Sequence, residues 1–139
     1  MTPEEVALLS ELPIIIQTYH RPLELERAIE YWRDPPVSVH LLHGSEKPWF
    51  PIGVCPGTNT ISYNHVPQNI GESSANNYSR RIALATELAN TNYSALCSDD
   101  DFFTIRGLVY AIQALSNDKS DVVIGRCAQY LFREGNFEW

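Results

Sequence analysis

Residues 12–17, Leu-Pro-Ile-Ile-Ile-Gln, decide the fold class. Three consecutive isoleucines leave no polar side chain for a solvent-facing side, so the run predicts a strand that is buried on both faces. Strands of this kind are typical of parallel sheets whose two faces are covered by helices. The run therefore indicates an α/β fold.

Working outward from this run, strand-like and helical segments alternate along the chain. We expect further strands at 37–42, 60–66, 93–97 and 122–125, and helices at 23–32, at 72–89 and from Thr104 onward. The 60–66 strand is the least apolar, which places it near a sheet edge. The pattern predicts one domain over residues 1–139, a doubly wound α/β fold with a mainly parallel sheet flanked by helices.

The helix expected at 72–89 carries an apolar stripe that we expect to face the sheet. Its members recur at helical spacing, and they are Ala75, Tyr78, Ile82, Ala85 and Ala89. Ser73 or Ser74 is expected to cap the start of this helix, because serine side chains accept hydrogen bonds from the first helical N–H groups.

Composition excludes several classes of protein and of partner. The 139 residues are 44% hydrophobic and 19% charged, which excludes a disordered tail or a coiled coil. A net charge of −7 argues against nucleic acid as a partner. An anionic ligand would therefore need a local device, such as a metal ion or a helix N-terminus.

The same composition bears on compartment. No apolar run approaches the length of a membrane span, and the acidic N-terminus lacks the pattern of a secretion signal. Cys55, Cys97 and Cys127 give an odd count without close spacing, so we expect reduced thiols. We expect a cytoplasmic protein, with peripheral attachment to the inner face of a membrane as the alternative.

Three adjacent carboxylates, Asp99, Asp100 and Asp101, directly follow the 93–97 strand. Ligands of open α/β sheets bind beyond the carboxyl ends of the strands. Carboxylate oxygens there would suit Mg²⁺ or Mn²⁺, which keep waters and take further oxygens from a substrate diphosphate. The alternative is a solvated acidic turn that caps the helix starting at Thr104.

A second polar segment, Gln17-Thr18-Tyr19-His20-Arg21-Pro22, follows the first strand. An aromatic face can stack on a base, and Arg21 can pair with a phosphate or carboxylate. Taken alone, the segment is also compatible with an ordinary polar turn between a strand and a helix.

The two segments together resemble the nucleotide-binding half of the GT-A glycosyltransferases, in particular the large family 2. Residues 14–22 look like that family's opening motif, apolar residues followed by Pro-Thr-Tyr-Asn-Arg-Pro. Residues 73–89, followed by 93–101, look like its long helix and its DxD strand, and 104–108 look like the start of the next helix. The resemblance spans residues 12–126.

The resemblance implies a metal-dependent transfer of a sugar from a nucleoside diphosphate donor to a glycan, lipid or protein acceptor. Thr18 and Tyr19 would contact the nucleobase and ribose, with Arg21 nearby. Asp99 would approach the ribose or the sugar, and Asp101 would hold the Mn²⁺ or Mg²⁺. Asp99 and Asp100 complete the expected metal set. The resemblance assigns no catalytic residue in this chain.

The chain departs from the family pattern at several positions. Gln17 replaces a proline and His20 an asparagine. His43 stands where family members carry an acidic residue near the base, and it is a candidate substitute as a hydrogen-bonding group. An Arg-Asn pair expected in the long helix is missing, and Arg80 or Arg81 is positioned to supply the lost charge.

Members of the resembled family continue well beyond the DxD strand into an acceptor-binding half, but only 38 residues follow Asp101 here. The resemblance therefore implies a C-terminally truncated fold that lacks most of that half. The alternative function is therefore a catalytically incomplete GT-A fragment that acts as a non-enzymatic binding or oligomeric module. Residues 132–139 are a candidate edge for pairing with another copy, which would give a homo-oligomer.

Overall fold

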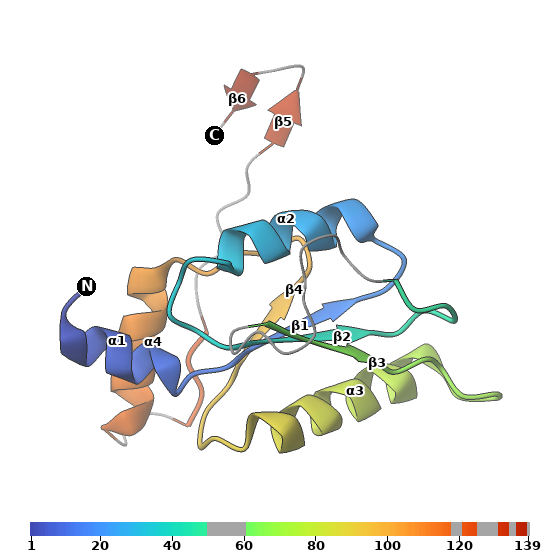
Figure 1. Ribbon diagram of the computed structural model, residues 1–139, viewed down its shortest axis with the longest axis horizontal. Coiled ribbons are helices and arrows are strands. Elements are labelled where there is room, and N and C mark those ends of the chain that lie inside the picture. The colour runs from blue at the N-terminus through green and yellow to red at the C-terminus, as the bar shows by residue number, and fades with distance from the viewer. Residues whose placement is uncertain (50–60, 118–120, 125–130, 134–135, 139) are drawn as a thin grey trace.

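A computed structural model of the chain describes residues 1–49, 61–117, 121–124, 131–133 and 136–138 (Figure 1). The elements in chain order are α1 (Pro3–Ser10), β1 (Ile14–Thr18), α2 (Pro22–Trp32), β2 (Val39–His43), β3 (Ile61–His65), α3 (Ser74–Ala89), β4 (Ala95–Ser98), α4 (Ile105–Ser116), β5 (Leu131–Arg133) and β6 (Asn136–Glu138).

Four of the strands form one parallel sheet in the order β3-β2-β1-β4. All five residues of β1 are buried, which confirms a central strand covered on both faces. β3 lies at one edge of the sheet, as its lower apolar content predicted, and β4 lies at the other edge.

Helices cover both faces of this sheet, which confirms the α/β class and the parallel sheet flanked by helices (Figure 1). One face packs into a large core that includes Ile14, Ile16 and Leu41 from the strands and Trp32 from α2, together with side chains of α1 and α4. The other face packs Ile15 and Leu42 against α3, in a smaller cluster with Ala85.

Helices α3 and α4 begin where capping side chains satisfy N–H groups of the first turn. Ser73 Oγ accepts from the backbone N–H of Asn76, and Thr104 Oγ1 accepts from that of Gly107. The Ser73 cap was expected, whereas Thr104 was expected only as the start of its helix. Helix α1 was not expected, although Thr2 and Glu5 form a reciprocal capping box that is visible as Thr-x-x-Glu in the sequence.

The expected apolar stripe of α3 is wrong in its register. The helix buries Asn77, Arg81 and Ala85, while Tyr78 is 42% exposed. The physical reason is that backbone carbonyls at the ends of β1, β2 and β3 need hydrogen-bond donors, which polar side chains of α3 supply. Asn77 donates to the carbonyl of Val66, and Arg81 donates to the carbonyls of Thr18 and Leu42.

The strand expected at 122–125 is also wrong for its described part. Residues 122–124 lie outside the sheet, and Val122 and Ile124 are 71% and 88% exposed. An apolar run becomes a strand only where it pairs in a sheet, so composition alone misassigned it. Gly125, Cys55 and Cys127 lie outside the described residues.

The C-terminal segment forms a separate two-stranded antiparallel sheet, in which β5 pairs with β6 (Figure 1). Expected pairing of residues 132–139 with another copy stays a prediction, and Trp139 lies outside the described part. Within the described ranges, no helix combines the length and the apolar character that crossing a membrane requires.

Candidate functional site

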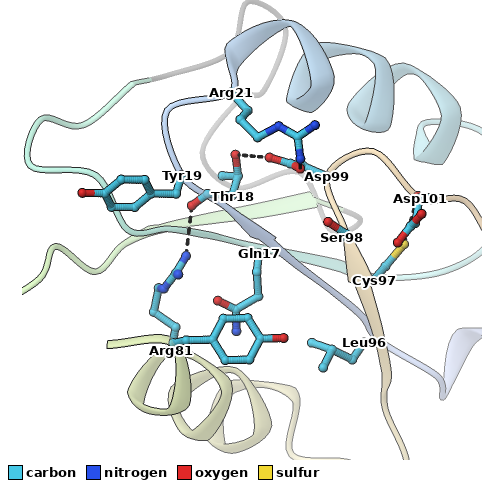
Figure 2. A pocket seen from close by; sticks show the side chains of 11 residues that line it. Gln17, Thr18, Tyr19, Arg21, Arg81, Leu96, Cys97, Ser98, Asp99 and Asp101 are labelled. Carbon is cyan, nitrogen blue, oxygen red and sulfur yellow. Dashed lines mark hydrogen bonds and ion pairs between the residues drawn. The ribbon is translucent and has the colours of Figure 1, made fainter. Parts of the chain in front are cut away.

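The register of β1 and β4 brings the two polar segments together at one edge of the sheet. Gln17 pairs with Ser98, so the next residue of each chain segment, Thr18 and Asp99, becomes a neighbour of the other. Thr18 Oγ1 donates to Asp99 Oδ2 at 2.7 Å across 81 residues of sequence (Figure 2). The expectation that both segments reach the same sheet edge is confirmed.

Arg21 closes this arrangement from the start of α2. Its Nη1 lies 2.9 Å from Asp99 Oδ1, and its Nη2 lies 2.8 Å from Asp100 Oδ2. Ser98 Oγ also donates to Asp100 at 2.8 Å. Thr18, Arg21, Asp99, Asp100 and Asp101 are called the carboxylate cluster below.

The carboxylates of Asp99 and Asp100 differ in their electrostatic state. Asp99 is 2% exposed, and burial raises its pKa above the usual range against the opposing effects of Thr18 and Arg21. Asp100 is exposed, and the hydrogen bond from Arg21 lowers its pKa. The guanidinium therefore serves as the counter-ion of both carboxylates, and its charge opposes the effect of burial on Asp99.

Asp101 is the remaining carboxylate of the triplet. Within the described ranges it makes no side-chain hydrogen bond or ion pair, and it lines a cavity of about 440 Å³ next to Asp99. The cavity extends from the ends of β1 and β4 to α3, and Tyr19 and Arg21 also line it. Tyr19 is 44% exposed, so its ring is available for stacking.

The side chains of the carboxylate cluster provide only part of the ligand set that a divalent metal ion needs. Among described side chains, no three of the His, Cys, Asp and Glu type are placed so that they would hold one ion. Asp99 and Asp100 are occupied by Arg21, whereas Asp101 faces the cavity. One carboxylate with waters and a ligand's phosphates is a sufficient set for Mg²⁺, so the cluster fits a metal that arrives with a diphosphate.

The position of His20 gives a backbone reason for one departure from the family motif. Its φ is 54°, in the left-handed region that asparagine tolerates better than most residues. The histidine therefore adopts the backbone conformation that suits an asparagine. Its ring contacts that of Tyr19 edge to face, with centroids 4.5 Å apart.

His43 belongs to a second group of side chains, at the ends of β2 and β3. Tyr63 accepts the N–H of Trp49 at 3.0 Å and lies 2.7 Å from His43 Nδ1. His43 Nε2 makes a hydrogen bond with Ser45 Oγ, and His65 Nε2 donates to the Ser45 carbonyl at 2.7 Å. His43, Ser45, Trp49, Tyr63 and His65 are called the histidine network below.

The two ring nitrogens of His43 both make hydrogen bonds in this network, Nδ1 with the Tyr63 hydroxyl and Nε2 with Ser45 Oγ. Burial lowers the pKa of His43 to about 4, so the ring is neutral at pH 7. Both nitrogens are bound within the protein, and His43 is 3% exposed. The ring is therefore not available as a substitute for the acidic residue near a base.

Arg81, one of two candidates for the charge missing from α3, is buried and lines the cavity. The other candidate, Arg80, forms hydrogen bonds with Glu72 instead, at 2.9 Å and 3.0 Å. Gln17 and Tyr78 also line the cavity. The sequence predicted Tyr78 only as part of the apolar stripe of α3, and it predicted no binding role for Gln17, the one polar residue in the run 12–17.

Comparison with models of known protein families and with curated protein sequences finds no match to this chain.

Proposed function

We propose that this chain binds a nucleoside diphosphate sugar and belongs to a metal-dependent glycosyltransferase of the GT-A type. The observation that carries the proposal is the contact of Thr18 and Arg21 with Asp99. It joins the two segments that resemble the family, at a sheet edge beside a cavity. The proposed reaction transfers the sugar to a glycan, lipid or protein acceptor.

The chemistry of the cluster supports binding of a diphosphate in spite of the net charge of −7. A guanidinium has five N–H donors, and Arg21 uses two of its nitrogens on carboxylates while its side chain stays 42% exposed. Donors therefore remain for phosphate oxygens, and the exposed ring of Tyr19 is within the same cavity.

The proposed cofactor is Mn²⁺ or Mg²⁺, held by Asp101 together with the donor's phosphates. When bound, such an ion stabilises the charge that develops on a leaving nucleoside diphosphate. Asp99 and Asp100 would join it only if Arg21 moved away, because Arg21 lies within 3 Å of both carboxylates. In this proposal, Asp99 mainly fixes Thr18 and Arg21 in place.

Calorimetric titration of uridine and guanosine diphosphates, with and without Mn²⁺, tests the proposal. We expect metal-dependent binding by the natural chain, and a loss on the order of tenfold or more for Asp101→Asn, since one carboxylate ligand is removed. Asp100→Asn is the matched control, because Asp100 belongs to the same triplet but is directed to Arg21 and Ser98.

Two outcomes would contradict the proposal. Absence of nucleotide binding in the presence of Mn²⁺ would remove the donor-binding function altogether. Equal losses for Asp100→Asn and Asp101→Asn would mean that the metal is not held by Asp101 in particular.

A further inference from the structure

Gln17 is a polar side chain that is buried in the central strand and has no hydrogen-bond partner in the described part of the chain. The residue is 8% exposed, and neither Oε1 nor Nε2 has a partner among the described residues. It points toward α3, on the face of β1 opposite to Thr18 (Figure 2). A buried amide that makes no hydrogen bond costs free energy, whereas an apolar side chain at the same place would not.

The surroundings of Gln17 indicate where its partner would come from. Gln17 lines the cavity that also contains the exposed ring of Tyr19. Trp32 Nε1 is a further buried donor that finds no partner in the ranges the structure describes, but it lies in the apolar core and does not line this cavity. The amide of Gln17 is therefore the buried group that a molecule in the cavity would satisfy.

Arg81 adds a second donor to the same cavity. The residue is 6% exposed, and its Nη1 donates to the carbonyls of Thr18 at 2.9 Å and Leu42 at 3.1 Å. Its Nε has no partner among the described residues. The guanidinium is fixed in place because Gly44 leaves room for it: a Cβ there would lie 2.8 Å from Arg81 Cζ.

We infer that Gln17 and Arg81 read the hydrogen-bonding edge of a pyrimidine base in the donor nucleotide. The inference rests on the proposed function, and it names the base that the site selects. Gln17 offers one acceptor and one donor group, and Arg81 Nε offers a further donor. A matching edge must present two acceptors and one donor.

The edges of the common bases differ in this respect. Uracil presents O2, N3–H and O4, and cytosine presents O2, N3 and the amino group, which is two acceptors and one donor in both. Guanine presents one acceptor and two donors, and adenine presents only two groups on that edge. The half-exposed rings of Tyr19 and Tyr78 line the same cavity and supply aromatic surface for stacking.

The test compares uridine, cytidine, guanosine and adenosine diphosphates in the presence of Mn²⁺, for the natural chain and for Gln17→Met. The methionine side chain is similar in length to that of glutamine, and its thioether is only a weak hydrogen-bond acceptor. We expect the natural chain to favour the two pyrimidines by roughly tenfold or more, in line with the loss of one good bidentate contact. Gln17→Met is expected to lose this preference while it keeps metal-dependent affinity for all four.

Thermal unfolding of the same two proteins gives a second readout. We expect Gln17→Met to unfold at a higher temperature than the natural chain without nucleotide, because it removes a buried amide without a partner. A lower unfolding temperature together with an unchanged base preference would assign Gln17 a purely structural role and overturn the inference.

A ligand-side substitution tests the contact without changing the protein. Methylation of N3 in uridine diphosphate removes the donor of the uracil edge, so we expect much weaker binding to the natural chain and little further loss with Gln17→Met. A preference for purines, or a pyrimidine preference that survives Gln17→Met, would overturn the inference. Failure of all four nucleotides to bind would instead reject the proposed function itself.

Discussion

The carboxylate cluster and the histidine network lie at the ends of neighbouring strands, and they differ in how their polar groups are satisfied. In the histidine network, both nitrogens of His43 have partners from Tyr63 and Ser45. Beside the carboxylate cluster, Asp101 faces the cavity and the amide of Gln17 has no partner among described residues. The same sheet edge therefore carries one self-contained network and one that is incomplete.

The presence or absence of hydrogen-bond partners within the protein distinguishes structural polar groups from those that bind a ligand. A buried network whose members all have partners stabilises the fold and does not need a ligand to satisfy its polar groups. A buried group without a partner lowers stability until a ligand satisfies it, which is the expected property of a binding site. On this criterion, His43 and Ser45 are structural.

The largest expected effect comes from breaking the histidine network. His43→Ala removes the partner of Tyr63 and of Ser45 and leaves a cavity, so we expect a loss of about 3 kcal/mol in the free energy of unfolding. Chemical denaturation measures it. Unchanged stability combined with a large loss of nucleotide affinity would reverse the comparison and make His43 a ligand-binding residue.

Acid provides a second way to break the same network. The pKa of His43 is about 4 in the folded chain, against about 6.5 when unfolded, because burial disfavours the charged ring. The unfolded state therefore binds the proton more readily. Stability is complete above pH 6.5 and is lost as pH falls through 4, by up to about 3 kcal/mol.

Unfolding measured in steps from pH 7 to pH 4 checks this expectation. Burial also lowers the pKa of His40, which adds to the loss in the same direction. His43→Gln does not titrate, so its stability is expected to change less over this range than that of the natural chain. Parallel pH profiles for the two proteins would show that His43 does not titrate as described.

Much of the architecture follows from local sequence. The triple isoleucine predicted β1, and helical periodicity with Ser73 as a cap predicted α3. Thr104 marked the start of α4, and the lower apolar content of 60–66 predicted the edge position of β3. These features depend on short-range periodicity and capping, which one segment carries by itself. The meeting of Thr18 with Asp99 also followed, because parallel strands end at the same edge.

The features that were missed depend on contacts between distant segments. The polar buried side of α3 arises because Arg81 reaches carbonyls of β1 and β2, and periodicity along α3 cannot reveal this. The hydrogen bond that occupies Nδ1 of His43 comes from Tyr63, which belongs to another strand. The partnerless state of Gln17 is likewise a property of its surroundings, since the residue type alone does not tell a satisfied amide from an unsatisfied one.

Gly44→Ala tests the contact between Gly44, which follows β2 beside the histidine network, and Arg81, which lines the cavity beside the carboxylate cluster. The new Cβ would lie 2.8 Å from Arg81 Cζ and 2.9 Å from Nη1, so the guanidinium would have to shift from the carbonyls of Thr18 and Leu42. We expect a loss of about 2 kcal/mol in the free energy of unfolding, as for an overpacked site that also loses hydrogen bonds. Denaturant unfolding measures the effect.

A double-mutant cycle sharpens this test, since Arg81→Lys removes the planar group that Gly44 accommodates. We expect Gly44→Ala to cost clearly less in the Arg81→Lys background than in the natural chain. Equal costs in both backgrounds would mean that the alanine acts on something other than the guanidinium.

The smallest expected effect concerns the competition between Arg21 and a metal ion in the carboxylate cluster. Arg21→Gln leaves Asp99 and Asp100 without their cation, so we expect the nucleotide-free protein to bind Mn²⁺ roughly threefold to tenfold more tightly, a difference of about 1 kcal/mol typical of partly exposed ion pairs. Titration of free Mn²⁺ by electron paramagnetic resonance measures this. Arg27→Gln is the matched control, because it removes the same charge from α2 at a position whose guanidinium lies 3.8 Å from Glu24 and outside the cluster. If both variants changed Mn²⁺ affinity equally, net charge would explain the effect, and Arg21 would lose its place as the resident counter-ion of the two carboxylates.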